Sequence, residues 1–520
     1  MDAASALRAP VEGTRLSWRV TPLALGAGLT LLAVALRLID LGTRPLWLDE
    51  AYSAWFSSRG WSDLWTVVPT YETHPPFYYS LLKLWRDVTG GGAVALRSLS
   101  VLIGALTVPV VIAAATELER QAPTGRPLLR AYVAGALAAL APMLLVLDQE
   151  ARPYPLLIFA YAVALLGLLR LLRELRVGPG SWRSWALLGF GTELTLWAHH
   201  LGALYAFCLA LALLPVWLRH PWDPSRSIRG VVTAAVVAAV YAPCLMMLLS
   251  RAGDWGTGWL GWDPMLLLQL LGLYGVPYEA LTIGSAISAL IMMLLIKRCI
   301  EAAFAGGGWT GERAILLLWF GPPILAAIIS ALFMPIFLPR TLAASLVPAY
   351  LAMSSAVARG PSRQERLFLA AGLSIPLLVT AVQVAMRPPM EHWSAVSAYL
   401  RQNVGLRDKV WLYPNDSALP LREAGYTSAQ AYGIPGEYPA VDFKGPIRAG
   451  SPAVVSLTPD QARKLASDPT LAHVRTIWLL TRQSELFDPG ADVPRALAGT
   501  RKAGAPQHWG YISVRPYVLR

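Results

Sequence analysis

Charged residues and cysteines are scarce in this chain of 520 residues. Asp, Glu, Lys and Arg make up 15% of the sequence, whereas soluble domains carry roughly 25% charged residues. The hydrophobic share is 55% and the mean hydropathy is +0.47, so the composition predicts a polytopic membrane protein rather than a soluble one. The three cysteines show no CxxC spacing and indicate neither a disulfide framework nor a zinc site.

The sequence has no clear internal repeat, no Gly/Ser-rich linker and no low-complexity segment. Acidic residues are outnumbered, because 44 Lys and Arg against 32 Asp and Glu give a formal net charge of +12. In a soluble protein this excess would favour a nucleic-acid partner. Here most basic residues lie in short links between apolar runs, so the positive-inside rule explains them and no nucleic acid is expected.

Long apolar runs are what the chain has in abundance. A helix that spans a membrane needs roughly 20 apolar residues, and about eleven runs are long enough to be candidates. They cover residues 21–39, 96–116, 131–147, 153–172, 185–197, 201–218, 231–249, 280–296, 314–332, 342–357 and 367–384.

Basic residues in the links predict the orientation of these spans. Alternate links carry arginine clusters such as that in residues 120–130, whereas Arg152 and Arg340 stand nearly alone in links of the other set. The first set is therefore expected in the cytoplasm, together with the N-terminal residues 1–20. An odd number of spans then places the chain after Arg387 on the outer side.

Three regions follow from this topology. Residues 21–385 are expected to form a transmembrane domain whose first outer loop covers residues 40–95. Within that loop, the short apolar stretch 75–88 is interpreted as a helix lying in the membrane interface. Residues 386–520 have shorter apolar runs and more turn residues, which predicts a small extracytoplasmic α/β domain. Its expected elements are helices at 394–403 and 458–466, the latter with a capping box, and strands at 409–413 and 474–480.

Two polar clusters lie in the first outer loop. Asp49 and Glu50 belong to WLDE (47–50), and Glu72 and His74 belong to YETHPP (71–76). Carboxylates beside hydrocarbon lose hydration, and catalysis on a lipid-borne substrate is one reason for such a position. Asp49 would be a general base, with Glu50 orienting it or holding a metal. A solvated acidic pair in a linker is the alternative.

The spacing of Glu72 and His74 places both side chains on one side of an extended segment. They are within reach of one metal ion or one phosphate. Two ligands are too few to establish a metal site, and a capped loop without a ligand is the alternative. A divalent metal at this pair is therefore left open.

Further polar residues are expected on the same side of the membrane. Arg152 lies in DQEARPY (148–154), where it could clamp a phosphate or belong to a self-neutralising ion-pair cluster. His199 and His200 occupy a short link, and a structural role is the favoured interpretation for them. Arg340 is either a snorkelling anchor or a ligand for the phosphate of a lipid carrier.

Together these features resemble the GT-C superfamily of integral-membrane glycosyltransferases, in particular the protein O-mannosyltransferase and aminoarabinose-transferase group. The motifs that carry the resemblance are LDEAY (48–52), HPPFYY (74–79), EARPY (150–154) and Pro339-Arg340, followed by a soluble outer domain. The order and membrane side of the motifs carry the resemblance, which covers roughly residues 20–400. One departure is Thr341, because family members often have tyrosine after this arginine.

The resemblance implies a mainly α GT-C fold that transfers a sugar, a hexose or pentose, from a polyprenyl phosphate carrier. The acceptor would be a glycan, a lipid or a protein on the outer side, and direct displacement would invert the anomeric carbon. Asp49 matches the family's catalytic acidic residue in the first outer loop, and Glu50 and Glu72 resemble acidic positions that line the same cavity. The residues expected to bind the substrate or its phosphate are Glu72, His74, Arg152, His200 and Arg340.

Other classes of protein fit less well. A transporter of lipid-linked sugars would place polar groups at the bilayer midplane, often in repeated halves. A polysaccharide ligase or polymerase would use a polyprenyl diphosphate glycan and need more basic residues at the outer span ends. A non-enzymatic assembly factor would leave the cluster of Asp49 and Glu72 unexplained. The expected location is a bacterial inner membrane, with membrane lipids around the spans.

Overall fold

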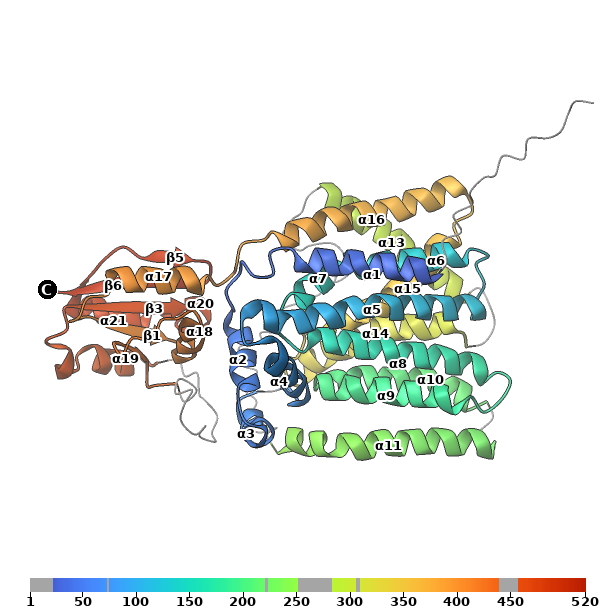
Figure 1. The fold of residues 1–520 in the computed structure, drawn as a ribbon, viewed down its shortest axis with the longest axis horizontal. Coiled ribbons are helices and arrows are strands. Elements are labelled where there is room, and N and C mark those ends of the chain that lie inside the picture. Colours follow the sequence, from blue (N-terminus) through green and yellow to red (C-terminus); the bar gives the residue numbers. More distant parts are fainter. Residues whose placement is uncertain (1–21, 73, 220–222, 251–282, 305–308, 439–456) are drawn as a thin grey trace, which may run out of the picture.

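A computed structural model describes residues 22–72, 74–219, 223–250, 283–304, 309–438 and 457–520. It is mainly helical, with a small β-sheet near the C-terminus (Figure 1). The helices form an elongated bundle, and the sheet belongs to a second body at one end of it. The predicted cytoplasmic segment 1–20 and the first residues of two predicted spans, 21 and 280–282, lie outside the described part of the chain.

The bundle contains helices at the predicted apolar runs. Their bounds are α1 Pro22–Leu38, α5 Ala93–Gln121, α6 Pro127–Leu140, α7 Pro142–Asp148, α8 Tyr154–Glu174, α9 Trp182–Ala198, α10 Gly202–Trp217, α11 Pro224–Leu249, α13 Ile283–Phe304, α14 Gly311–Leu332, α15 Leu346–Ala358 and α16 Arg363–Ala385, with the 3₁₀ turn η2 Pro339–Ser345 before α15. Within the described residues, six of these segments are long and apolar enough to span a membrane. The pair α6–α7, bent by 51°, would make seven. The number eleven therefore stays a prediction.

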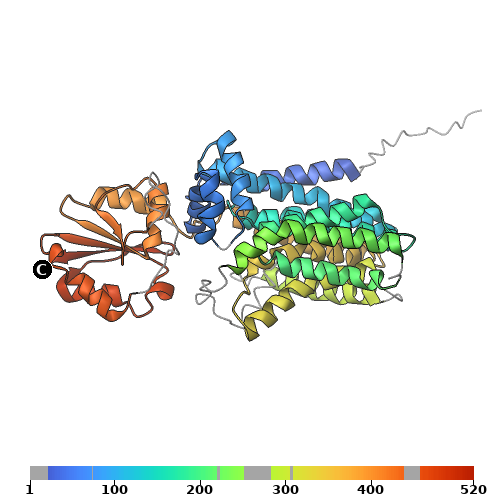
Figure 2. The same cartoon turned by 90° about the horizontal axis from the view of Figure 1, so that it is seen from below.

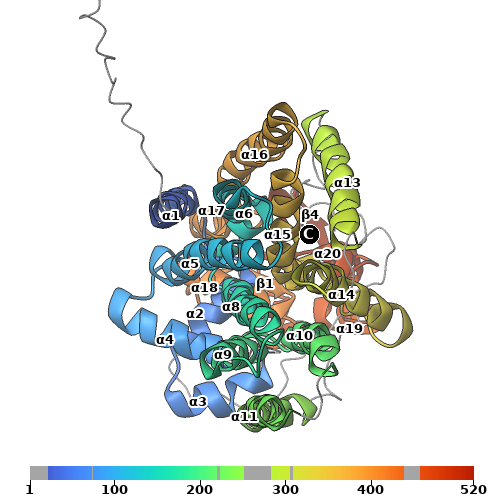
Figure 3. The ribbon, with the colours of Figure 1, turned by 90° about the vertical axis from the view of Figure 1, so that its right-hand side faces the viewer.

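Helix α8 lies near the centre of the bundle in the end-on view of Figure 3. It packs closely against α9 because two glycines remove side chains from the contact. A Cβ atom on Gly191 would lie 2.3 Å from the backbone nitrogen of Ala164, and one on Gly167 would lie 2.5 Å from that of Leu188. Helix α11 lies at the periphery and exposes apolar side chains such as Val231 and Leu249. Such a surface fits contact with lipid.

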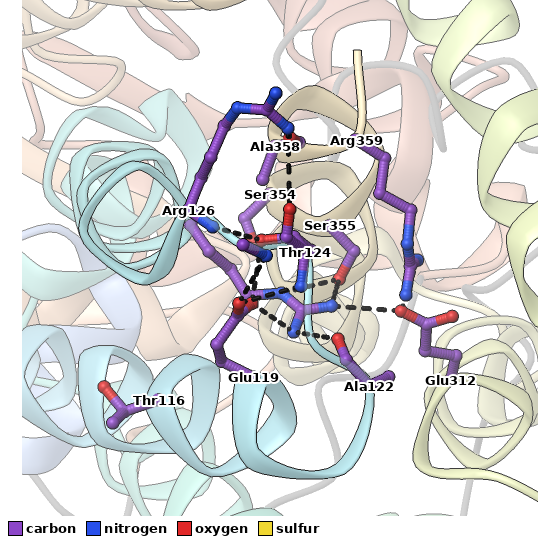
Figure 4. Close-up of polar contacts among 12 residues, drawn as sticks. Thr116, Glu119, Ala122, Thr124, Arg126, Glu312, Ser354, Ser355, Ala358 and Arg359 are labelled. Atoms are coloured by element: carbon purple, nitrogen blue, oxygen red, sulfur yellow. Dashed lines mark hydrogen bonds and ion pairs between the residues drawn. The ribbon is translucent and has the colours of Figure 1, made fainter. Parts of the chain in front are cut away.

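At the end of the bundle opposite the sheet, a buried network of ion pairs and hydrogen bonds joins the ends of four helices (Figure 4). Arg130 of α6 pairs with Glu119 at 2.9 Å and with Glu312 at 3.0 Å, and its guanidinium also donates to Ser355. Arg359 pairs with the same carboxylate of Glu312. The network therefore connects α5, α6, α14 and α15 at one point.

The segment between α1 and α5 forms a layer of short helices between the bundle and the sheet. These are α2 Leu48–Ser57, α3 Trp61–Thr66, η1 Val68–Thr70 and α4 Phe77–Thr89. Figures 1 and 2 show α2–α4 beside the end of the bundle that faces the sheet domain. The helix predicted at 75–88 is confirmed as α4, and its interfacial position stays a prediction.

The C-terminal domain is a sheet with the strand order β2-β1-β3-β6-β4, to which β5 adds by pairing with β6. Strands β1 and β3 are parallel, and β6 runs antiparallel to β3. The strands are β1 Lys409–Tyr413, β2 Ala431–Gly433, β3 Thr476–Arg482, β4 Arg501–Ala503, β5 Gln507–Trp509 and β6 Ile512–Leu519, and the helices are α17 Trp393–Asn403, α18 Ala418–Glu423, α19 Pro459–Ala466, α20 Ser484–Phe487 and α21 Asp492–Thr500.

Local signals in this tail are confirmed by the structure. The strand predicted at 409–413 is β1, and the helix predicted at 394–403 is α17 extended by one residue. The strand predicted at 474–480 is β3, which begins and ends two residues later. The capping box before α19 is formed as expected, with Thr458 accepting from the amide of Gln461 and Gln461 accepting from the amide of Thr458.

Candidate active site

Asp49 and Glu50 lie at the start of α2, the helix that faces the sheet domain. The backbone of Trp47 is extended, and the helix begins at Leu48. Adjacent helical residues are rotated by about 100°, so the two carboxylates point in different directions. The side chain of Asp49 is 22% exposed, whereas that of Glu50 is fully buried.

Glu50 is an anchor for α2. Its carboxylate makes a bidentate pair with Arg97 of α5 at 2.6 and 2.7 Å, and it also accepts from the amide of Ala151. Arg97 in turn donates to the carbonyls of Leu41, Arg44 and Pro45. The contacts of Glu50 thus fit a structural role, and the expectation that it orients Asp49 or holds a metal stays a prediction.

Two arginines from distant parts of the chain converge on Asp49. Its Oδ2 lies 3.8 Å from Nη2 of Arg152 and 3.7 Å from Nη2 of Arg340. Arg152 follows α7, and Arg340 lies in η2 at the start of the late apolar segment. The Arg340 guanidinium also lies over the rings of Trp47 and Tyr154, at 5.8 Å from each ring centre. These aromatic faces favour the charged guanidinium in a partly dry site.

Glu72, His74 and Tyr79 form a second polar group around Arg152. One carboxylate oxygen of Glu72 lies 2.5 Å from Nδ1 of His74. The other accepts from the Tyr79 hydroxyl at 2.6 Å and from Arg152 at 3.3 Å. Burial would raise the pKa of Glu72, but His74 and Arg152 hold that pKa well below its usual range. Glu72 is therefore an ionised carboxylate that fixes the orientation of Arg152.

Histidine and tyrosine rings form one wall of this region. The rings of His74 and His199 meet edge-on at 4.5 Å, and Tyr154 lies about 6 Å from both. His199 accepts from the amide of Leu201 through Nδ1, which fits its expected structural role. Burial and the neighbouring His74 lower the pKa of His200 to about 4, so this ring is neutral at pH 7. A neutral imidazole does not supply charge to a phosphate.

The other acidic residues near Arg152 have partners elsewhere, which corrects the alternative of a self-neutralising cluster. Asp148 pairs with Arg37 of α1 at 2.7 Å. Glu150 lies 3.5 Å from Arg387, in the segment after α16. The acidic partners of Arg152 are instead Asp49 and Glu72, which lie in the segment between α1 and α5.

The structure brings most of the predicted site residues together. Asp49, Glu72, His74, Arg152 and Arg340 form one continuous set of contacts. Sequence reasoning did not assign Tyr79 or Tyr154 to the site. The signal was present, because both tyrosines belong to the HPPFYY and EARPY motifs, but a lone tyrosine near a membrane is usually an interface residue.

The contacts of Glu72 do not favour a metal site. Both of its oxygens face hydrogen-bond donors, and Arg152 lies where a cation would have to bind. In the parts of the chain that the structure describes, no three His, Cys, Asp or Glu side chains are grouped as metal ligands.

Comparisons with known proteins find similarity at the level of structure. No family model matches the sequence, and no curated protein matches it. The crystal structure of ArnT from Cupriavidus metallidurans bound to undecaprenyl phosphate has a TM-score of 0.58 at 14% identity, covering 94% of this chain and 97% of that one. Its apo state gives a TM-score of 0.59 at 13% identity, with the same coverage.

A solved archaeal structure is also similar to this chain. The oligosaccharyltransferase AglB from Archaeoglobus fulgidus, in complex with an inhibitory peptide and a dolichol-phosphate, has a TM-score of 0.55 at 13% identity. The match covers 96% of this chain and 74% of that one. The chain therefore shares its fold with ArnT and AglB.

Proposed function

We propose that the chain is a membrane glycosyltransferase that moves a sugar from a polyprenyl phosphate carrier to an acceptor on the outer side. The observation that carries this proposal is the approach of Arg152 and Arg340 to the same carboxylate oxygen of Asp49. This arrangement combines one carboxylate that can act as a base with two arginines that can bind a phosphate. The similar ArnT structure, which is bound to undecaprenyl phosphate, supports a carrier of this class.

Arg152 and Arg340 are proposed to bind the carrier phosphate. Within the described residues, the Nε atoms of both arginines are buried and have no hydrogen-bond partner. Their contacts with Asp49 are longer than the 2.7–2.9 Å of a good charge-assisted hydrogen bond. A phosphate oxygen can therefore approach both guanidinium groups and replace the weak contacts to Asp49.

Asp49 is proposed as the general base. It takes the proton from the acceptor hydroxyl or amine as that atom bonds to the anomeric carbon. The bond between the anomeric carbon and the phosphate oxygen breaks, and the phosphate leaves with the electron pair. The attack comes from the opposite face, so the anomeric configuration is inverted. Arg152 and Arg340 stabilise the charge on the leaving phosphate.

Glu72, His74 and Tyr79 are proposed to support Arg152. Two hydrogen bonds around Glu72 and its contact with Arg152 hold the guanidinium in one orientation before the substrate arrives. Such preorganisation lowers the cost of arranging charges during the reaction. His200 is proposed to offer the phosphate a hydrogen bond and no positive charge, because its ring is neutral.

The membrane arrangement remains part of the proposal. Residues 21–385 would be the transmembrane domain of a multi-pass bacterial inner-membrane protein, and residues 386–520 an extracytoplasmic domain. The arginines in the links 120–130 and 359–366 lie at the end of the bundle away from the sheet domain. The positive-inside rule would place that end in the cytoplasm and the Asp49 site outside.

A donor comparison in membrane vesicles tests the proposal. Vesicles that contain the protein are given radiolabelled polyprenyl monophosphate sugars or polyprenyl diphosphate oligosaccharides, and label in the acceptor fraction is counted. The proposal predicts transfer from a monophosphate donor. Transfer only from diphosphate donors would favour a ligase or polymerase, and movement of label across the membrane without a new glycosidic bond would favour a transporter.

A further inference from the structure

The N-terminus of α2 needs hydrogen-bond acceptors that its own capping residue does not supply. The first amides of a helix have no partner within the helix, and a side-chain oxygen usually accepts from them. Trp47 occupies the capping position, and its indole offers no such oxygen. Glu50 reaches back to the Trp47 amide at 3.4 Å, which leaves the Leu48 amide to another group.

That other group is Glu391, 343 positions further along the chain. Its Oε2 accepts from the Leu48 amide at 3.0 Å, immediately before Asp49. A carboxylate at this position also interacts favourably with the partial positive charge of a helix N-terminus. Glu391 precedes α17 and is 3% exposed, so the contact is buried between the helical part and the sheet domain.

Glu391 is fixed to the sheet domain through its backbone and side chain. Its backbone forms a β-bridge with Gly510, and the neighbouring Tyr511 amide donates to the Met390 carbonyl at 2.9 Å. Gly510 has a φ of +66°, and a Cβ on it would lie 1.9 Å from the Met390 carbonyl oxygen. The close approach therefore requires glycine. Trp393 adds an indole hydrogen bond of 2.8 Å to the Glu391 carboxylate.

A buried arginine connects the same carboxylate to the end of the central strand. Arg482 of β3 lies 3.6 Å from Glu391 and 3.4 Å from Asp416. Burial raises the pKa of Glu391, and Arg482 opposes that rise. A hydrogen bond between the hydroxyls of Tyr52 and Tyr438 joins α2 to the sheet domain a second time.

We infer that Glu391 is a positioning residue for Asp49, and that the sheet domain is a working part of the catalytic site. The carboxylate holds the first turn of α2, and through it the distance between Asp49 and the reacting atoms. This inference rests on the proposed function for its catalytic consequence. Its structural part stands on the contact between Glu391 and the Leu48 amide alone.

Hydrogen exchange on the full-length protein in detergent micelles tests the structural part without any substrate. The variants Glu391→Gln and Glu391→Ala are compared with wild type, following the peptide that covers residues 47–57. Exchange in this peptide is expected to accelerate at least about tenfold in Glu391→Ala and less in Glu391→Gln, whose amide oxygen can still accept. Unchanged exchange in both variants would overturn the inference.

Asp408 offers a matched control in the same domain. Its buried carboxylate accepts from the Thr476 amide and the Trp478 indole, both at 3.1 Å, and both donors belong to β3 rather than to α2. Asp408→Asn should loosen the sheet and leave exchange in residues 47–57 unchanged. Equal acceleration in both variants would mean that Glu391 only stabilises the domain, which would contradict the inference.

Transfer kinetics test the catalytic part. At a temperature where all variants stay folded, Glu391→Ala is expected to lower kcat by about 100-fold, because a displacement of about 1 Å can cost this much. KM for the carrier should change less than twofold, and Glu391→Gln should be intermediate. Unchanged kcat with accelerated exchange would overturn the catalytic part. An inactive wild type would instead count against the proposed function and leave the exchange result valid.

Discussion

At the scale of single residues, two neighbouring carboxylates have different environments. Glu50 is buried in a bidentate pair with Arg97, whereas Asp49 is partly exposed and lies near both Arg152 and Arg340. The sequence predicted a role at the site for both residues, because it shows their charge and position along the chain but not the direction in which each side chain points. The helix start at Leu48 decides which one faces the site. This division of roles underlies the proposed mechanism.

Arg340 gives the first prediction. Arg340→Gln removes one of the two guanidinium groups proposed to hold the carrier phosphate, so the Kd for undecaprenyl phosphate should rise about tenfold or more. Binding to the purified protein in micelles is measured by titration. Arg495, an exposed arginine of α21, is the control, and Arg495→Gln should leave the Kd unchanged. Equal affinities of wild type and Arg340→Gln would remove Arg340 from the phosphate site.

Glu150 gives a prediction about pH. Burial raises its pKa to about 7, and Arg387 opposes that rise. Because the folded protein binds this proton more tightly than the unfolded chain, the stabilisation is complete below about pH 4.5 and is lost as the pH rises to about 7. The free energy of unfolding is expected to fall by about 3 kcal/mol over this pH range. Glu150→Gln should flatten the dependence of the unfolding temperature on pH in this range, and identical pH profiles would contradict the assignment.

At the scale of elements, α2 is held from three sides. The pair of Glu50 and Arg97 joins it to α5, Ala151 joins it to the loop before α8, and Glu391 joins it to the sheet domain. The sequence predicted the helical bundle elements, because apolar length is a local property. It did not predict the Arg97 contact, since a basic residue near a span end usually snorkels to the interface.

A double-mutant cycle tests the anchor. Glu50→Gln leaves Arg97 buried without its partner and is expected to cost about 3 kcal/mol of stability. Arg97→Gln should be similarly harmful, and the double variant should be less harmful than the sum by about 1–3 kcal/mol. Thermal unfolding in detergent measures all four proteins. Loss of transfer with unchanged unfolding in Glu50→Gln would return Glu50 to a catalytic role.

The buried network at the other end of the bundle gives a second prediction for elements. Arg130→Met removes the ion-pair partner of Glu119 and one of the two partners of Glu312. Removing one partner of a buried ion pair costs about 3–5 kcal/mol. Arg126 is the control, because its guanidinium donates to the carbonyl oxygens of Ala358 and Thr124 without an ion pair to the described acids. Arg126→Met should lower the unfolding temperature clearly less. Equal losses in the two variants would contradict a clamp centred on Arg130.

At the scale of the whole molecule, the general architecture was predictable and the contact between its two parts was not. Apolar runs and the capping box at Thr458 act over short distances, so the sequence indicates the helices and several elements of the tail. The contact between Glu391 and Leu48 joins residues 343 positions apart. Neither residue has a local signal for it, and the sheet order depends on long-range pairing in the same way.

The central claim is that Asp49 is the base that activates the acceptor. In the whole protein reconstituted in liposomes, carrier binding and single-turnover sugar transfer are measured separately for wild type, Asp49→Asn and the control Asp63→Asn. Asp63 is a carboxylate of α3, in the same segment between α1 and α5. We predict that Asp49→Asn still binds the polyprenyl phosphate sugar but transfers it at least about 100-fold more slowly, while Asp63→Asn matches wild type. Transfer by Asp49→Asn at the wild-type rate would contradict the account.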